Sequence, residues 1–205
     1  MRNVHRLVGV AVLAAASVSC GDVVRDGRSP VFLTIDSLQA SAGGGAATAS
    51  SFLLSDVQKL IITPAPCSAL TPCPTIFNDS GTATFRIVPK DIAALPVPTS
   101  NNEVTISRYR VVYRRSDGRN TPGVDVPFPF DGAVTALVGV GAATSVGFEL
   151  VRHVAKEESP LVQLVTSRQV ITTIAEVTFY GTDRVGNAIS VTGTIQVDFG
   201  NFGDS

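Results

Sequence analysis

Histidine, the side chain that most often serves as a general base, occurs only twice in this 205-residue chain. His153 is the only histidine after the first few residues, so a Ser-His-Asp triad would have to use it. No Gly-x-Ser-x-Gly elbow accompanies it. We interpret His153 as a surface histidine on a strand that turns Phe148, Leu150 and Val154 toward the core and Val151 outward.

Paired carboxylates are the other route to hydrolysis, because glycosidases hold two of them about 5 to 9.5 Å apart across a cleft. The candidates on predicted loops are Asp117, Asp125, Asp131, Glu157 and Glu158. Each lies beside turn residues, where carboxylates commonly cap the backbone. The sequence therefore predicts no catalytic residues, no cofactor and a protein that is not an enzyme.

Two loop segments carry oxygen ligands that suit calcium. One is the run 117–120 together with Asp125, and the other pairs Asp183 with Asn187. Neither has the ligand spacing of an EF-hand loop. We interpret both as Asp-containing turns and predict no metal site.

A cationic strip is the most distinctive candidate for a binding surface. The predicted strand over residues 104–115 places Tyr109, Val111 and Tyr113 on one face and Arg108, Arg110 and Arg114 on the other. Such a strip could bind an anionic glycan, a lipid head group or an acidic partner, or it could pair with acidic residues of the next strand. The following proline-rich loop adds Phe128 and Phe130, as binding residues or as a plug at one end of the domain.

The N-terminus has the pattern of a secretory signal. Basic residues precede an apolar run over residues 7–16, and small residues precede Cys20. The apolar run is shorter than the roughly 20 residues that a membrane span needs. We predict a signal peptide over residues 1–19, a tether over 20–29 and a single domain over 30–205.

The segment 17–21 (SVSCG) resembles the lipobox of bacterial lipoproteins, whose cysteine becomes the lipidated first residue of the mature protein. The resemblance implies lipidation of Cys20 and a protein anchored in the cell envelope, at the outer membrane or the cell surface. Ser17 and Ser19 also fit an ordinary signal peptidase, which cuts at the same bond and leaves a periplasmic or secreted chain. Both interpretations predict export.

If Cys20 carries lipid, Cys67 and Cys73 remain as an even pair in an oxidising compartment, and we predict a disulfide between them. So short a closure contributes about 2 to 2.5 kcal/mol in the chain-entropy model. Neither cysteine has a zinc-ligand neighbour, and their spacing is not C-x-x-C, which argues against metal and redox roles.

Composition supports a compact domain that does not bind nucleic acid. Removal of Arg2 and Arg6 with the signal leaves 14 basic and 17 acidic residues, a formal charge of −3. Nucleic-acid binding needs a basic face. Hydrophobic residues make up 44% of the chain and charged residues 16%, enough apolar surface for a packed core.

Runs rich in Val, Ile, Thr, Phe and Tyr alternate with Gly, Pro, Asn and Asp clusters, which predicts an all-β fold. The clearest strands, over residues 171–179 and 189–199, flank a hairpin turn. Further strands are predicted over residues 31–35, 52–62, 82–88, 104–115, 135–140, 145–154 and 161–165, with a helical turn over 89–95 and a flexible loop over 41–51.

The stretch 175–199 resembles the closing hairpin of bacterial immunoglobulin-like and fibronectin-III-like domains, through Asp183, Gly186 and Asn187. The resemblance implies an antiparallel two-sheet β-sandwich with long loops and a binding or spacer role. We expect an envelope lipoprotein that binds an envelope protein or glycan, or that serves as a structural module. A small β-sandwich hydrolase acting on envelope carbohydrate, or an assembly subunit that works by strand addition, are the alternatives.

Overall fold

The computed structural model describes residues 28–45, 48–90 and 99–202. Cys20, the tether up to residue 27 and most of the helical turn predicted over residues 89–95 lie outside the described residues. The helices within the described ranges are short, namely η1 (Ser100–Asn102), α3 (His153–Glu157) and η2 (Leu161–Thr166). No helix in these ranges is long and apolar enough to cross a membrane.

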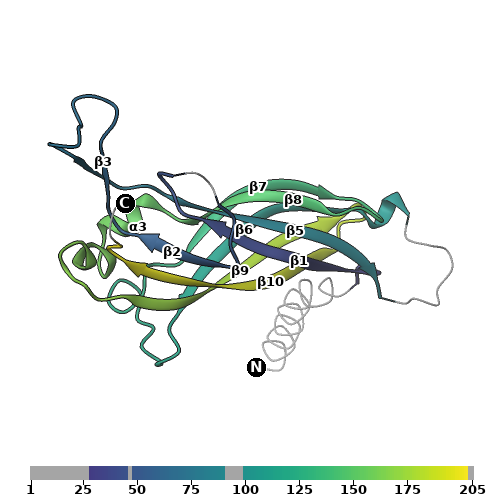
Figure 1. The fold of residues 1–205 in the computed structure, drawn as a ribbon. Coiled ribbons are helices and arrows are strands. Elements are labelled where there is room, and N and C mark those ends of the chain that lie inside the picture. The colour runs from purple at the N-terminus through teal and green to yellow at the C-terminus, as the bar shows by residue number, and fades with distance from the viewer. Residues whose placement is uncertain (1–27, 46–47, 91–98, 203–205) are drawn as a thin grey trace, which may run out of the picture.

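Two sheets pack face to face along the long axis of the domain (Figure 1). One is antiparallel, with the order β1 (Val31–Ser41), β5 (Asp79–Pro89) and β8 (Thr144–Val151). The other has the order β2 (Phe52–Asp56), β10 (Ala188–Gly200), β9 (Ile171–Asp183), β6 (Val104–Arg114) and β7 (Phe130–Val138). Its β2 runs parallel to β10 and the other pairs are antiparallel. The predicted all-β sandwich with long loops is confirmed.

Aromatic rings from both sheets interlock in the core. The strands are amphipathic because successive side chains point to opposite faces of a sheet. Phe85 of β5 packs edge-on against Phe179 of β9, with ring centroids 4.8 Å apart. Phe148 of β8 lies 5.2 Å from both Phe179 and Tyr109 of β6. Pairs of this kind contribute about 0.5–1.5 kcal/mol each beyond the buried area, so they fix how the two sheets meet.

Two predictions around residues 145–165 are wrong. The segment predicted as a strand over 161–165 forms η2, and its buried side chains, Leu161 and Leu164, are three residues apart, which is one turn of a 3-10 helix. The strand predicted over 145–154 ends at Val151, and His153 opens α3. Val151 is buried next to buried Leu150, because a bulge opposite Asp79 shifts the register of β8. Val154 is exposed because it lies on α3, after the strand has ended.

Several long connections leave the sandwich at one end, which we call the loop end (Figure 1). They are residues 57–78, 115–129 and 152–170. A small hairpin of β3 (Lys59–Ile61) and β4 (Cys73–Thr75) projects there. The first strand begins at the opposite end, which we call the N-terminal end, where Val31 pairs with Pro89.

A buried ion pair joins several segments at the loop end. The Nζ of Lys156 in α3 lies 2.8 Å from Oδ2 of Asp79 in β5, and both side chains are 1% exposed. Lys156 also donates to the carbonyl oxygen of Asp56, at 2.8 Å. Asp79 accepts hydrogen bonds from the Ser55 hydroxyl at 2.6 Å and the Gly43 N–H at 2.8 Å. The pair therefore ties α3 to β2, to β5 and to the connection after β1.

Tyr113 of β6 is buried near this ion pair. Its hydroxyl donates to the carbonyl oxygen of Leu150 at 2.6 Å, which links the two sheets. Burial raises the pKa of Tyr113 far above its usual range, and the negative charge of Asp79 raises it further. The phenol therefore remains a neutral donor across the physiological pH range.

Replacement of Lys156 by Met should lower the free energy of unfolding by about 3–5 kcal/mol, because Asp79 would keep a buried charge without its partner. Urea denaturation followed by circular dichroism would measure this. Lys59→Met, in β3 outside the sandwich, is the matched control and should change stability by less than about 0.5 kcal/mol. Equal effects of the two substitutions would contradict the role given to the ion pair.

Candidate functional site

The predicted cationic strip lies on the outer face of β6, and its arginines are paired with acidic residues of the neighbouring strands. Arg110 lies 2.7 Å and Arg108 3.4 Å from the carboxylate of Asp131 in β7. Arg114 lies 2.7 Å from Glu176 in β9. Because these partners neutralise much of the positive charge, the strip is a self-paired sheet surface rather than an open anion site.

The two phenylalanines of the proline-rich loop lie in different environments. Phe130 is buried, with its ring centroid 6.2 Å from that of Tyr109 and under the guanidinium of Arg152 at 4.4 Å. This packing removes Phe130 from the exposed surface. Phe128 is about half exposed and lies against Gly123, whose φ of +75° and close approach leave no room for a Cβ.

The disulfide predicted between Cys67 and Cys73 is present, with the two Cα atoms 5.3 Å apart. It closes the tip of the β3–β4 hairpin, outside the packed core. Cys20, the predicted site of lipidation, lies outside the described residues.

The acidic residues singled out in the sequence do not gather at one point. Asp131 binds the arginines of β6, and Glu157 and Glu158 are exposed at the end of α3. His153 is exposed on the same helix. Among residues 28–45, 48–90 and 99–202, no three His, Cys, Asp or Glu side chains form a group that could hold a metal ion.

The carboxylate of Asp183 accepts hydrogen bonds from residues of its own turn. Asp183 accepts hydrogen bonds from the backbone N–H groups of Val185 and Asn187, and from the Asn187 amide at 2.8 Å. Burial alone would raise the pKa of Asp183, but these hydrogen bonds outweigh it and lower the pKa. The carboxylate therefore acts as the cap of a hairpin turn.

Loop 115–129 is held in shape by two of its acidic side chains. Asp117 lies between two guanidinium groups, 2.7 Å from Arg115 and 2.9 Å from Arg119. Asp125 accepts the backbone N–H of Thr121 at 3.1 Å. The hydrogen bonds from Arg115, followed by those from Arg119, lower the pKa of Asp117 to about 2. The loop therefore presents its arginines on a preformed frame.

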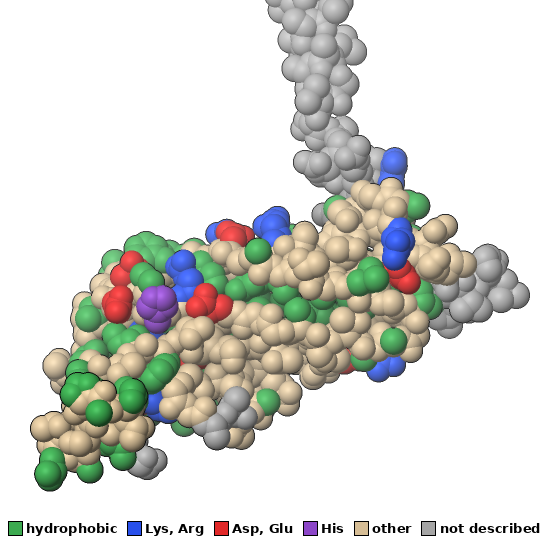
Figure 2. All heavy atoms as spheres, turned by 90° about the horizontal axis from the view of Figure 1, so that it is seen from above, with side chains coloured by type: hydrophobic (Ala, Val, Ile, Leu, Met, Phe, Trp, Pro, Cys, Tyr) green, Lys and Arg blue, Asp and Glu red, His purple; other side chains and the backbone are tan. Residues whose placement is uncertain are grey.

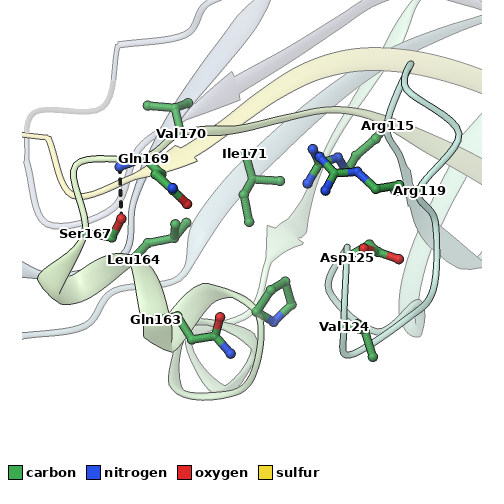
Figure 3. A pocket seen from close by; sticks show the side chains of 11 residues that line it. Arg115, Arg119, Val124, Asp125, Gln163, Leu164, Ser167, Gln169, Val170 and Ile171 are labelled. Carbon is green, nitrogen blue, oxygen red and sulfur yellow. Dashed lines mark hydrogen bonds between the residues drawn. The ribbon is translucent and has the colours of Figure 1, made fainter.

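An open cleft of about 720 Å³ lies between this loop and the segment that runs from η2 into β9 (Figure 3). One wall carries Arg115, Arg119 and Asp125, and the other carries Gln163, Ser167 and Gln169. The apolar part of the lining consists of Val124, Pro160, Leu164, Val170 and Ile171. This volume lies in the range of small-ligand sites.

The cleft combines balanced charge with several uncharged polar groups. The guanidinium groups of Arg115 and Arg119 are matched by the carboxylate of Asp125 in the lining and by that of Asp117, which binds both arginines from outside the lining. The amides of the Gln side chains and the Ser167 hydroxyl both donate and accept hydrogen bonds. Such a lining suits a neutral ligand rich in hydroxyl groups, with its C–H faces against the apolar part.

The sequence did not single out the cleft or the buried ion pair. Gln163 and Gln169 carry no motif, and Gln163 falls in the run 161–165, which the sequence predicts as a strand. Nothing in the sequence distinguishes Lys156 from the other charged residues. Its burial depends on its ion pair with Asp79, which is distant in the sequence. The sequence does carry one signal for the burial of Asp79. Small or apolar residues follow it at every second position of β5, which places Asp79 on the buried face of the strand.

Comparison with known proteins identified no relative: no family model, no curated protein and no solved structure matches the chain.

The carboxyl of Asp117 should titrate with a midpoint near pH 2. Since folding lowers its pKa from 3.8, its contribution to stability is present above about pH 4 and is lost as the pH falls toward 2. Carbonyl NMR would record the titration. Arg115→Gln should raise the midpoint toward 3.8, whereas Arg86→Gln, on the other sheet, should leave it unchanged. A midpoint near 3.8 in the unaltered protein would contradict the pairing of Asp117 with Arg115 and Arg119.

Proposed function

We propose that this chain is an exported cell-envelope lipoprotein, anchored through Cys20, whose β-sandwich binds a neutral glycan in the loop-end cleft. The lining of the cleft is the observation that carries the binding role. The lipobox-like segment before Cys20 supports the location.

Binding of a glycan requires polar groups that are already ordered. The N–H of Gln169 donates to the Ser167 hydroxyl at 3.2 Å, and the amide of Gln163 lies 3.3 Å from the Ser159 hydroxyl. Arg115 and Arg119 are held through Asp117. Ordered groups lose little conformational entropy on binding, which favours recognition of a flexible, weakly apolar ligand.

The lining of the cleft favours binding over hydrolysis. Asp125 is the single carboxylate among the described residues that line it. Its Oδ2 already accepts a hydrogen bond from the backbone of Thr121. Hydrolysis of a glycoside by the usual route needs a second carboxylate about 5 to 9.5 Å away. We therefore propose a binding protein and keep a carbohydrate hydrolase as the weaker alternative.

Titration calorimetry with neutral tri- to hexasaccharides of glucose, mannose and N-acetylglucosamine should reveal a ligand with a dissociation constant of about 0.1 mM, roughly 5.5 kcal/mol. Gln163→Ala should weaken it about 5-fold, the worth of a net hydrogen bond of ~1 kcal/mol. Gln196→Ala, exposed on β10, is the matched control. Binding of acidic sugars alone, weakened by salt, would contradict a neutral ligand.

Mass spectrometry of the membrane fraction should find Cys20 as a lipid-modified N-terminus. Cys20→Ser should release the chain from the membrane fraction, because only the cysteine thiol accepts the lipid. A soluble chain that begins at an unmodified Cys20 would remove the anchor from the proposal and leave its binding role standing.

A further inference from the structure

The β3–β4 hairpin is a rigid projection at the loop end, and apolar side chains gather on it in the space-filling view (Figure 2). At its tip, the backbone N–H of Ser68 donates to the Thr71 carbonyl at 3.0 Å, and the N–H of Thr71 returns a bond to the Ser68 carbonyl at 3.1 Å. The disulfide between Cys67 and Cys73 encloses this tight turn. The conformation of the tip is therefore set before it meets any partner.

Beyond Lys59 at its base, the hairpin presents aliphatic side chains to solvent and carries no charge. Leu70, at the apex of the turn, is 94% exposed, Ile62 is 53% exposed and Leu60 is 45% exposed. From residue 60 to residue 78 the sequence contains no Asp, Glu, Lys, Arg or His. A convex, uncharged apolar projection on a soluble surface marks an interaction site.

Several polar groups of the tip form hydrogen bonds with one another. The hydroxyl groups of Ser68 and Thr71 bond to each other at 2.8 Å, and the N–H of Cys67 donates to the carbonyl of Pro64 at 3.1 Å. Prolines, which have no N–H, recur through the segment at Pro64, Pro66, Pro72 and Pro74. Entry into hydrocarbon demands that backbone polar groups be satisfied internally.

We propose that this hairpin inserts its tip into the surface of a lipid bilayer, as a second attachment beside the anchor at Cys20; the inference rests on the proposed envelope location. A protein interface would use about one hydrogen bond per 100–200 Å², whereas the hydroxyl groups of Ser68 and Thr71 and the backbone N–H groups of the same two residues already form bonds within the tip. The exposed aliphatic area amounts to about two whole side chains. Partitioning through the hairpin alone is therefore weak and reversible.

The dimensions of the chain allow both attachments on one membrane. The 13-residue β9 spans about 43 Å, close to the length of the sandwich. The tether over residues 20–29 reaches at most about 35 Å. A domain lying along the bilayer can therefore place its N-terminal end near the anchor while the hairpin touches the same surface.

A tryptophan reporter tests the insertion directly, because the sequence has no Trp. In the mature chain carrying Cys20→Ser, Leu70→Trp should give a blue-shifted emission with phosphatidylcholine vesicles and be quenched by brominated acyl chains. Val185→Trp, at a position 67% exposed in the turn at the N-terminal end, is the matched control and should show neither change.

Flotation of the same Cys20→Ser chain with these vesicles gives a second measurement. Leu70→Asp should lower the partition coefficient at least 10-fold, and Val185→Asp should leave it unchanged. Equal loss in both variants, absence of vesicle binding, or crosslinking of position 70 to a protein in place of lipid would overturn the proposal. Because these variants lack Cys20, a negative result would count against insertion of the hairpin and not against the lipid anchor or glycan binding in the cleft.

Discussion

Lys156 and Asp79 form an ion pair that is shielded from water, and the loop end is organised around it. Removing two charges from water is costly, and their attraction offsets this only when further hydrogen bonds satisfy both groups. Here Ser55, Gly43 and the carbonyl of Asp56 supply those bonds. The arrangement therefore selects one geometry for the chain segments that meet there.

Two features of the loop end are connected to that geometry. α3, which carries Lys156, leads into η2 and so into one wall of the cleft. Asp56 ends β2, after which the chain enters the β3–β4 hairpin. On the outer face of β6, by contrast, Arg108 and Arg110 form ion pairs with Asp131 of the neighbouring strand β7. The proposed binding surfaces therefore lie beyond the ends of the strands, in loops that take no part in the pairing of the two sheets.

The sequence predicted those features that depend on neighbouring residues. The alternation in β9 and β10, the Asp183 turn and the disulfide across a short loop all follow from local spacing. The helix η2 escaped prediction because a short, mostly apolar run such as 161–165 fits a strand and a helix equally well. The outward position of Val154 escaped it because β8 ends at Val151 and Val154 lies on α3, whereas the apolar residues of this segment suggest that the strand continues. The cleft and the burial of Lys156 depend on segments brought together only by the fold.

The position of the last strand has a consequence for the order in which the domain folds. β10 lies inside the five-stranded sheet, between β9 and the early strand β2, whose hydrogen-bonded neighbour it is. A nascent chain that lacks its final residues thus leaves β2 without a sheet to join and Tyr113 without the ring of Phe199 beside it. Pairing between such distant segments slows folding. The five-stranded sheet can therefore be completed only after synthesis has reached β10.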